Sequence, residues 1–178
     1  LIQTTTLASS ASAVSFSLGS TTYTDLYLLL NARTDTNNTK DQLLIQMNSD
    51  TTTSNYSSGY NAADGTNAAF ASLYTRTTSA AGIKFAGLPG ANASAGVRGA
   101  LEIELININS NYYKTVLGKG GFTDISATPV GTIGVYNGSW RSTSAVTSVD
   151  LKPASGGNFV SGGTFSLYGV RHYGGGGF

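Results

Sequence analysis

The stretch Leu26-Tyr27-Leu28-Leu29-Leu30 carries a leucine at every second position. Successive side chains of a β-strand point to opposite faces, so Leu26, Leu28 and Leu30 share one face, and Tyr27 and Leu29 share the other. An amphipathic helix would instead place its apolar residues three or four positions apart. The stretch therefore predicts a strand with one face in a hydrophobic core.

The same spacing of two recurs along the chain. It is found at Val14, Phe16 and Leu18, at Leu43, Ile45 and Met47, and at Leu101, Ile103 and Leu105. Clusters of Gly, Asn, Asp and Ser separate these runs, and no window of about 11 residues keeps a helical period. We therefore expect an all-β chain of about eight to ten strands, folded as an antiparallel two-sheet sandwich that is jelly-roll-like.

Short polar stretches between apolar runs predict hairpins. Residues 26–30 and 43–47 flank the polar turn 34–40, and we expect these two runs to pair. Residues 101–106 and 112–117 flank an Asn-rich turn and are expected to pair in the same way.

Three further expectations concern the second half of the chain. Asn137-Gly138 is a strong signal for a tight hairpin turn. The most apolar alternations, residues 23–30 and 165–170, are expected to be neighbours near the core. Trp140 is expected to close one end of the sandwich.

The domain organisation that we predict is simple. Residues 1–170 form a single β-sandwich domain, and residues 171–178 form a Gly-rich C-terminal arm. Within the domain, residues 49–98 are rich in Thr, Ser, Gly, Ala and Asn, and we expect a long polar contact segment there. Weak strands around residues 70–75 and 83–86 would interrupt this segment.

The composition excludes several classes of function. The 178 residues include no cysteine, so disulfide frameworks, zinc–thiolate sites and cysteine nucleophiles are excluded. Only 11% of the residues are charged, and the net charge is +1. The basic residues are scattered, which argues against binding to nucleic acid, and no apolar run of about 20 residues predicts a membrane span.

Catalytic chemistry has little support in the sequence. His172 is the one histidine and lies near the Gly-rich terminus, so we expect neither a Ser-His-Asp triad nor a histidine-based metal site. Glu102 and Glu104 would share one strand face, whereas glycosidase carboxylates flank a substrate. We expect this pair to face solvent or to bind Arg98 or Lys114 of a neighbouring subunit. We predict no catalytic, cofactor-binding or metal-binding residues, and no cofactor.

Exposed aromatic and basic residues are the candidates for contact with a partner. Tyr56 and Tyr60 lie in the polar segment, where a tyrosine can stack on a sugar or anchor a protein partner. Arg141 is a candidate for an intersubunit hydrogen bond, and the terminal arm could lie on a neighbour. The predicted partner-binding residues are Tyr56, Tyr60, Arg141, Arg171, His172, Tyr173 and Phe178.

An ordered set of segments resembles a known family. The segments include Thr22-Tyr23-Thr24-Asp25-Leu26, Trp140-Arg141-Ser142-Thr143-Ser144-Ala145-Val146-Thr147-Ser148 and Phe165-Ser166-Leu167-Tyr168-Gly169-Val170. This series is similar to small all-β virion structural proteins of tailed bacteriophages of the environmental and cyanophage type. The resemblance implies a place on the virion and supplies no catalytic residues.

The resemblance leaves two functions open. The first is a capsid decoration (cement) protein, a homotrimer on the outer head surface that binds the major capsid protein or other virion proteins and stabilises the capsid. The alternative is a tail-fibre or tailspike module that recognises the host by binding surface glycan. Neither function implies a nucleic-acid or membrane partner.

Overall fold

The computed structural model describes residues 1–19, 21–64, 70–73, 80–124 and 130–171. His172, Tyr173 and Phe178 of the predicted arm lie outside the described residues.

The described residues form twelve strands and one short 3-10 helix. The strands are β1 (Gln3–Thr6), β2 (Val14–Ser17), β3 (Asp25–Ala32), β4 (Lys40–Met47), β5 (Tyr56–Asp64), β6 (Phe70–Leu73), β7 (Ile83–Pro89), β8 (Gly99–Ile106), β9 (Lys114–Asp124), β10 (Val130–Trp140), β11 (Ser148–Pro153) and β12 (Thr164–Val170), and the helix is η1 (Thr53–Asn55). The all-β prediction is confirmed, although eight to ten strands was too few.

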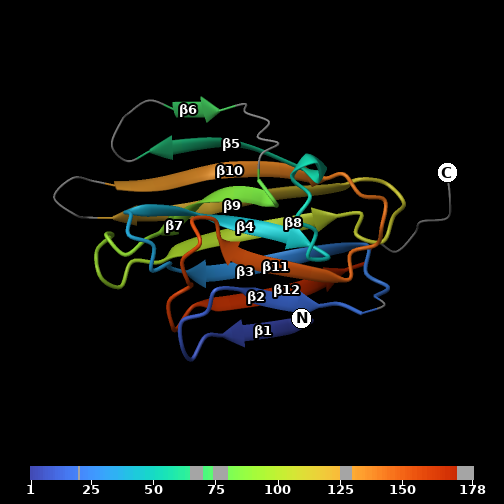
Figure 1. Cartoon of the computed structure of the whole chain (residues 1–178), viewed down its shortest axis with the longest axis horizontal. Helices are drawn as coiled ribbons and strands as arrows, with labels where there is room; N and C mark the ends of the chain where they lie inside the picture. The colour runs from blue at the N-terminus through green and yellow to red at the C-terminus, as the bar shows by residue number, and fades with distance from the viewer. Residues whose placement is uncertain (20, 65–69, 74–79, 125–129, 172–178) are drawn as a thin grey trace.

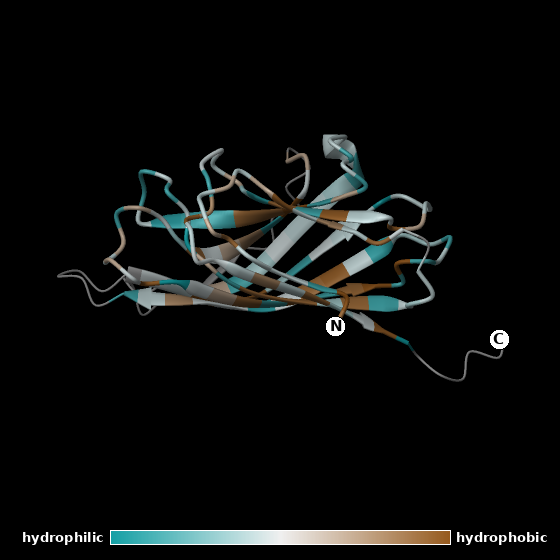
Figure 2. Ribbon diagram, turned by 90° about the horizontal axis from the view of Figure 1, so that it is seen from below, coloured by the Kyte–Doolittle hydropathy of each residue, from teal (hydrophilic) through white to brown (hydrophobic). Residues whose placement is uncertain are grey.

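All strand pairs are antiparallel and belong to two sheets (Figure 1). The large sheet has the order β1-β12-β3-β8-β9-β10-β5-β6, and the small sheet has the order β2-β11-β4-β7. The two sheets lie one above the other, and hydrophobic residues occur along strands of both layers (Figure 2). The two-sheet sandwich is therefore confirmed.

The strand order is that of a jelly roll with two inserted hairpins. When β5, β6, β9 and β10 are set aside, the other eight strands form the quartets β1-β12-β3-β8 and β2-β11-β4-β7, and in chain order they alternate between these quartets at every step except from β4 to β7. This alternation is the topology of an eight-stranded jelly roll. The pairs β5–β6 and β9–β10 both join the large sheet beyond β8 and widen it. They account for the four additional strands.

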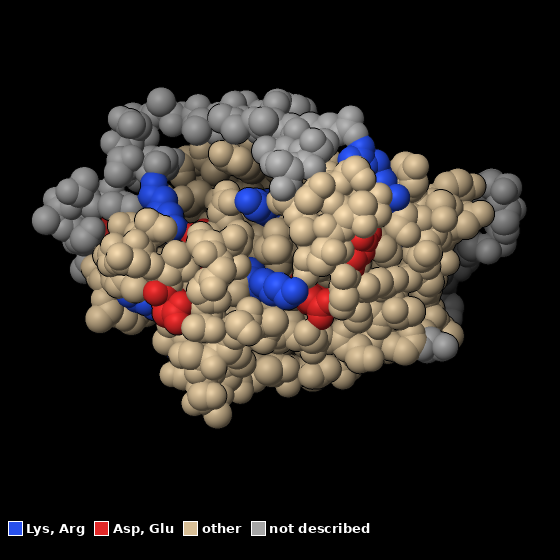
Figure 3. Space-filling view, viewed as in Figure 1, with Lys and Arg blue, Asp and Glu red and all other residues tan. Residues whose placement is uncertain are grey.

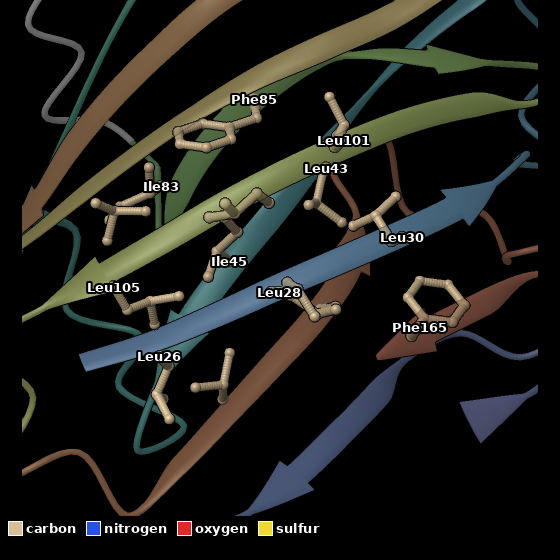
Figure 4. Packing of buried hydrophobic residues seen from close by; sticks show 14 of the residues in the cluster. Leu26, Leu28, Leu30, Leu43, Ile45, Ile83, Phe85, Leu101, Leu105 and Phe165 are labelled. Atoms are coloured by element: carbon tan, nitrogen blue, oxygen red, sulfur yellow. The ribbon is translucent and has the colours of Figure 1, made fainter. Parts of the chain in front are cut away.

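The core fills the space between the two sheets. Leu26, Leu28 and Leu30 of β3 are buried, and they meet apolar side chains from the small sheet, among them Leu43 and Ile45 of β4 (Figure 4). Fully burying a leucine side chain stabilises a fold by about 1.5–3 kcal/mol, so this alternation is enough to orient the strand. Trp140, at the end of β10, is also buried, as expected for a residue that closes the sandwich.

Two of the expected pairings are confirmed and one is wrong. β12 pairs with β3, with Leu167 opposite Leu28, and β8 pairs with β9, with Leu105 opposite Val116. β3 and β4, however, lie in different sheets. The turn between them crosses from one layer to the other because both strands present an apolar face, and these faces are buried against each other across the core.

The prediction of a hairpin turn at Asn137-Gly138 is also wrong. Both residues lie within β10, opposite Gly59 and Ser58 of β5. A Cβ atom at Gly138 would lie 2.4 Å from Cγ2 of Ile83. Glycine is required at position 138 because β7 of the small sheet packs closely against it, and no turn forms there.

The long polar contact segment, residues 49–98, includes regular structure among its described residues. It contains β5, β6 and β7, of which β6 and β7 fall on the two expected weak strands. Ile83, Phe85 and Leu88 of β7 are buried. Ser58 on the buried face of β5 accepts a hydrogen bond of 2.9 Å from the backbone amide of Lys84. A hydroxyl with such a partner can face the core, which explains why β5 looks polar in the sequence.

Candidate binding face of the large sheet

Tyr56 does not offer its ring to a partner, because the side chain is fully buried. Its hydroxyl donates a hydrogen bond of 3.0 Å to the backbone oxygen of Asp50 and accepts one of 3.2 Å from the amide of Met47. Burial raises the pKa of Tyr56 to about 12. The prediction that Tyr56 is a partner contact is therefore wrong, and the residue instead ties η1 to the end of β4.

Tyr60 is half-buried and packs against the core from β5. It lines a hollow of about 380 Å³ together with Asp41, Gln42 and Thr132. It therefore lies at the mouth of the sandwich, away from any flat exposed surface.

The two predicted arginine contacts bind the protein's own chain. Nη2 of Arg141 donates to the backbone oxygens of Ser54 and, at 3.5 Å, Tyr56. The guanidinium of Arg171 lies 5.3 Å from the ring centroid of Tyr23. Both arginines therefore secure loops at the end of the sandwich where β10 and β12 finish.

A broad groove crosses the outer face of the large sheet, where the sequence predicted no site. It has a volume of about 770 Å³ and spans β12, β3, β8, β9, β10 and β5. We call it the outer groove, and the lining side chains used below are Leu29, Asn61, Glu102, Lys119, Ile133 and Val135. A second hollow of about 410 Å³ shares Glu102, Lys119 and Val135 with it, so the two are continuous.

Strand register explains how these side chains come together. Leu29, Glu102, Lys119, Val135 and Asn61 lie opposite one another in turn across β3, β8, β9, β10 and β5. Side chains directly opposite in antiparallel strands lie about 4.5–5.5 Å apart at Cβ, so the row is continuous. It combines residues from five separate parts of the chain.

One ion pair lies in the middle of this row. Nζ of Lys119 is 3.1 Å from Oε2 of Glu102, and the hydroxyl of Tyr27 donates a hydrogen bond of 2.8 Å to the same oxygen. The hydrogen bond from Tyr27, with that from Lys119, lowers the pKa of Glu102. Glu102 is therefore ionised and neutralised inside its own chain.

This pairing corrects the expected partners of Glu102. Arg98 and Lys114 were the predicted cations, but Arg98 donates to the backbone oxygen of Ser161, and Lys114 faces inward and is fully buried. Lys119 is the cation that the antiparallel register places directly opposite Glu102. Glu104 is exposed on the same face.

Three aliphatic side chains are exposed beside the ion pair. Leu117 is 42% exposed, Ile133 is 54% exposed and Val135 is 57% exposed. Ile133 and Val135 are successive outward residues of β10, and Leu117 of β9 is diagonal to Val135. Soluble domains seldom gather such side chains without a contact to make. The alternation of residues 133 and 135 was visible in the sequence, but which face it occupies was not.

The part of the chain that the structure describes holds no group of three or more His, Asp or Glu residues placed to hold a metal ion. It also holds no helix that is long and apolar enough to cross a membrane. Figure 3, which like Figure 1 looks onto the small sheet, shows few charged side chains on that opposite face.

The sequence matches no protein-family model, and a search of curated proteins finds no match. The fold and the outer groove together define a jelly-roll β-sandwich with an open, weakly charged sheet face.

Proposed function

We propose that this chain is a virion structural protein of a tailed bacteriophage, a capsid decoration (cement) protein that attaches through the outer face of its large sheet. The partner on the head is the major capsid protein or another virion protein, and the decorating unit is a homotrimer. The observation that carries the proposal is the exposed aliphatic cluster of Leu117, Ile133 and Val135 on that face.

The energetics of this face suit attachment in many copies. Burying apolar surface contributes about 25 cal/mol per Å², so three aliphatic side chains give a modest affinity for each contact. The ion pair of Glu102 and Lys119 is already formed, so these two side chains add no unpaired charge to the contact. Repeated weak contacts on one particle then add up through avidity.

The fold agrees with this proposal by analogy. Jelly-roll sandwiches recur in viral capsid proteins and in lectins, although a fold alone does not fix a function. Of these two classes, the resemblance of the sequence to phage virion proteins favours the viral capsid proteins.

Binding of the purified protein to isolated heads stripped of it tests the proposal. Val135→Glu replaces an exposed aliphatic side chain of the cluster with a charged one that the contact would have to desolvate, and it should weaken co-sedimentation with heads by about tenfold or more. Ser17→Glu is the matched control, because Ser17 is exposed on β2 of the small sheet. Binding that Val135→Glu leaves unchanged, or that Ser17→Glu abolishes, would contradict the proposal.

A second function, host recognition by a tail-fibre or tailspike module that binds surface glycan, is favoured by a different observation. Tyr112 and Tyr113 are exposed side by side on the loop between β8 and β9.

A further inference from the structure

The loop between β8 and β9 presents two aromatic rings to solvent. Tyr112 is 71% exposed and Tyr113 is 57% exposed, and no other aromatic side chain among those the structure describes is as open. Both lie at the end of the sandwich, away from the outer groove, and neither contributes to the core.

A buried lysine fixes the backbone beneath these rings. Lys114 is fully buried, and its Nζ donates hydrogen bonds to the backbone oxygens of Ser110 at 2.8 Å, Tyr112 at 2.6 Å and Ser142 at 3.3 Å. An ammonium group has three donors, and here all three are used. The lysine thus holds the tyrosine loop to the neighbouring loop after β10.

The other end of the loop is held as firmly. Ile108 is fully buried, its amide donates 2.9 Å to the oxygen of Thr24, and its oxygen accepts 2.8 Å from the amide of Val146. Nδ2 of Asn109 donates to the backbone oxygens of Thr21 and Tyr23 at 2.8 and 2.7 Å. The rings therefore project from a preorganised support, and a ligand need not order the loop when it binds.

Two cations near the loop are engaged with backbone oxygens. Lys114 is enclosed, and Arg141 points to the backbone of Ser54. Ser110 and Asn111 precede the two tyrosines in the loop, and Ser142 lies in the neighbouring loop that Lys114 ties to it. A neutral ligand rich in hydroxyl groups therefore finds apolar rings and hydrogen-bonding groups together at this tip.

We propose that Tyr112 and Tyr113 form a carbohydrate-binding tip that stacks on the C–H faces of neutral sugars. Tyrosine suits this role because its ring supplies a large rigid contact with only two side-chain torsions to fix. The tip is separate from the outer groove, so one protein can bind the virion with its sheet and a glycan with its loops.

The test is a binding titration followed by NMR. The probes are neutral oligosaccharides of glucose, galactose, mannose and N-acetylglucosamine, with saturation transfer from the protein to the sugar ring protons as the readout. We expect at least one probe to bind, with amide shifts confined to residues 107–114 and 141–147. Tyr112→Ser and Tyr113→Ser should each weaken it about tenfold, as for an anchor residue.

The double variant Ile133→Ser/Val135→Ser is the control, because it alters the outer face and leaves the loop intact. All of these side chains are exposed, so the variants should fold as the wild type does. Absence of binding to every probe, binding that survives both tyrosine substitutions, or binding that only the control abolishes would each overturn the proposal. Head attachment should be unchanged in the tyrosine variants, so failure here and failure of the decoration function are distinguishable.

Discussion

Nζ of Lys114 lies 2.6 Å from the backbone oxygen of Tyr112, in a site with no solvent exposure of the lysine. The same arrangement recurs elsewhere in the protein. The guanidinium of Arg33 donates to the backbone oxygens of Ala91, Ala93 and Ser94, in the loop between β7 and β8. The chain has only nine acidic residues, and Lys114 and Arg33 both use their donors to hold the backbone of loops.

Replacing Lys114 by Met should loosen the tyrosine loop. The methionine fills similar space but leaves three backbone oxygens without their donor, and an unsatisfied buried polar group costs about 1–3 kcal/mol. We expect the free energy of unfolding to fall by about 2 kcal/mol. Hydrogen exchange at residues 108–113 should accelerate more than exchange in the strands. Lys119→Met removes only an exposed ion pair and should change stability by less than about 0.5 kcal/mol. Equal losses of stability in the two variants would contradict the role of Lys114 in holding the tyrosine loop.

Asp50 should make the fold sensitive to acid. Burial alone would raise the pKa of Asp50, but hydrogen bonds from Trp140, Asn55 and Thr52 outweigh it and lower the pKa to about 2 from an ordinary value of 3.8. The unfolded chain therefore takes up this proton first as the pH falls. The stabilisation is complete above about pH 4 and is lost between about pH 4 and pH 2.

The substitution Asp50→Asn tests the direction of this dependence of stability on pH. We expect the substitution to lower stability at pH 7 by about 1 kcal/mol once solvent screening is allowed for, and to reduce the further loss on acidification to pH 2.5. Urea unfolding of both proteins at the two pH values provides the comparison. A variant that loses as much stability on acidification as the wild type would show that Asp50 is not responsible.

Gly138→Ala should destabilise the fold, because Gly138 lies where β10 packs closely against the small sheet. The added methyl group would lie 2.4 Å from Cγ2 of Ile83 and 2.7 Å from the backbone oxygen of Ser57, so the two sheets would have to separate locally. Overpacking of this kind costs about 1–3 kcal/mol. Asn137→Ala, one residue earlier and exposed, is the control and should be close to neutral. Thermal unfolding of the two variants provides the comparison. An unchanged melting temperature for Gly138→Ala would contradict the close contact between Gly138 and Ile83.

The sequence allowed prediction of the fold wherever one face of a strand is apolar. β3 and β8 alternate clearly because each buries Leu or Ile at every second residue. β5 was not recognised because its buried face carries Ser58, whose hydroxyl has a partner on β7. The Asn137-Gly138 turn failed because glycine serves both turns and close packing, and only the tertiary structure separates these uses.

The candidate site was less predictable than the fold. The outer groove depends on the register of six strands, and no local pattern encodes that register. Tyr56 was misassigned because a tyrosine in a polar context can be either a surface anchor or a buried ring with a hydrogen-bonded hydroxyl. Tyr112 and Tyr113 were included in the strand predicted over residues 112–117, whereas β9 begins at Lys114 and leaves both tyrosines in the loop.

The most direct measurement of the central claim is immunogold electron microscopy of intact phage particles with an antibody raised against this chain. The account predicts gold spread over the outer surface of the head, and loss of that label from particles assembled with Val135→Glu. Gold confined to the tail or its fibres would contradict the decoration function.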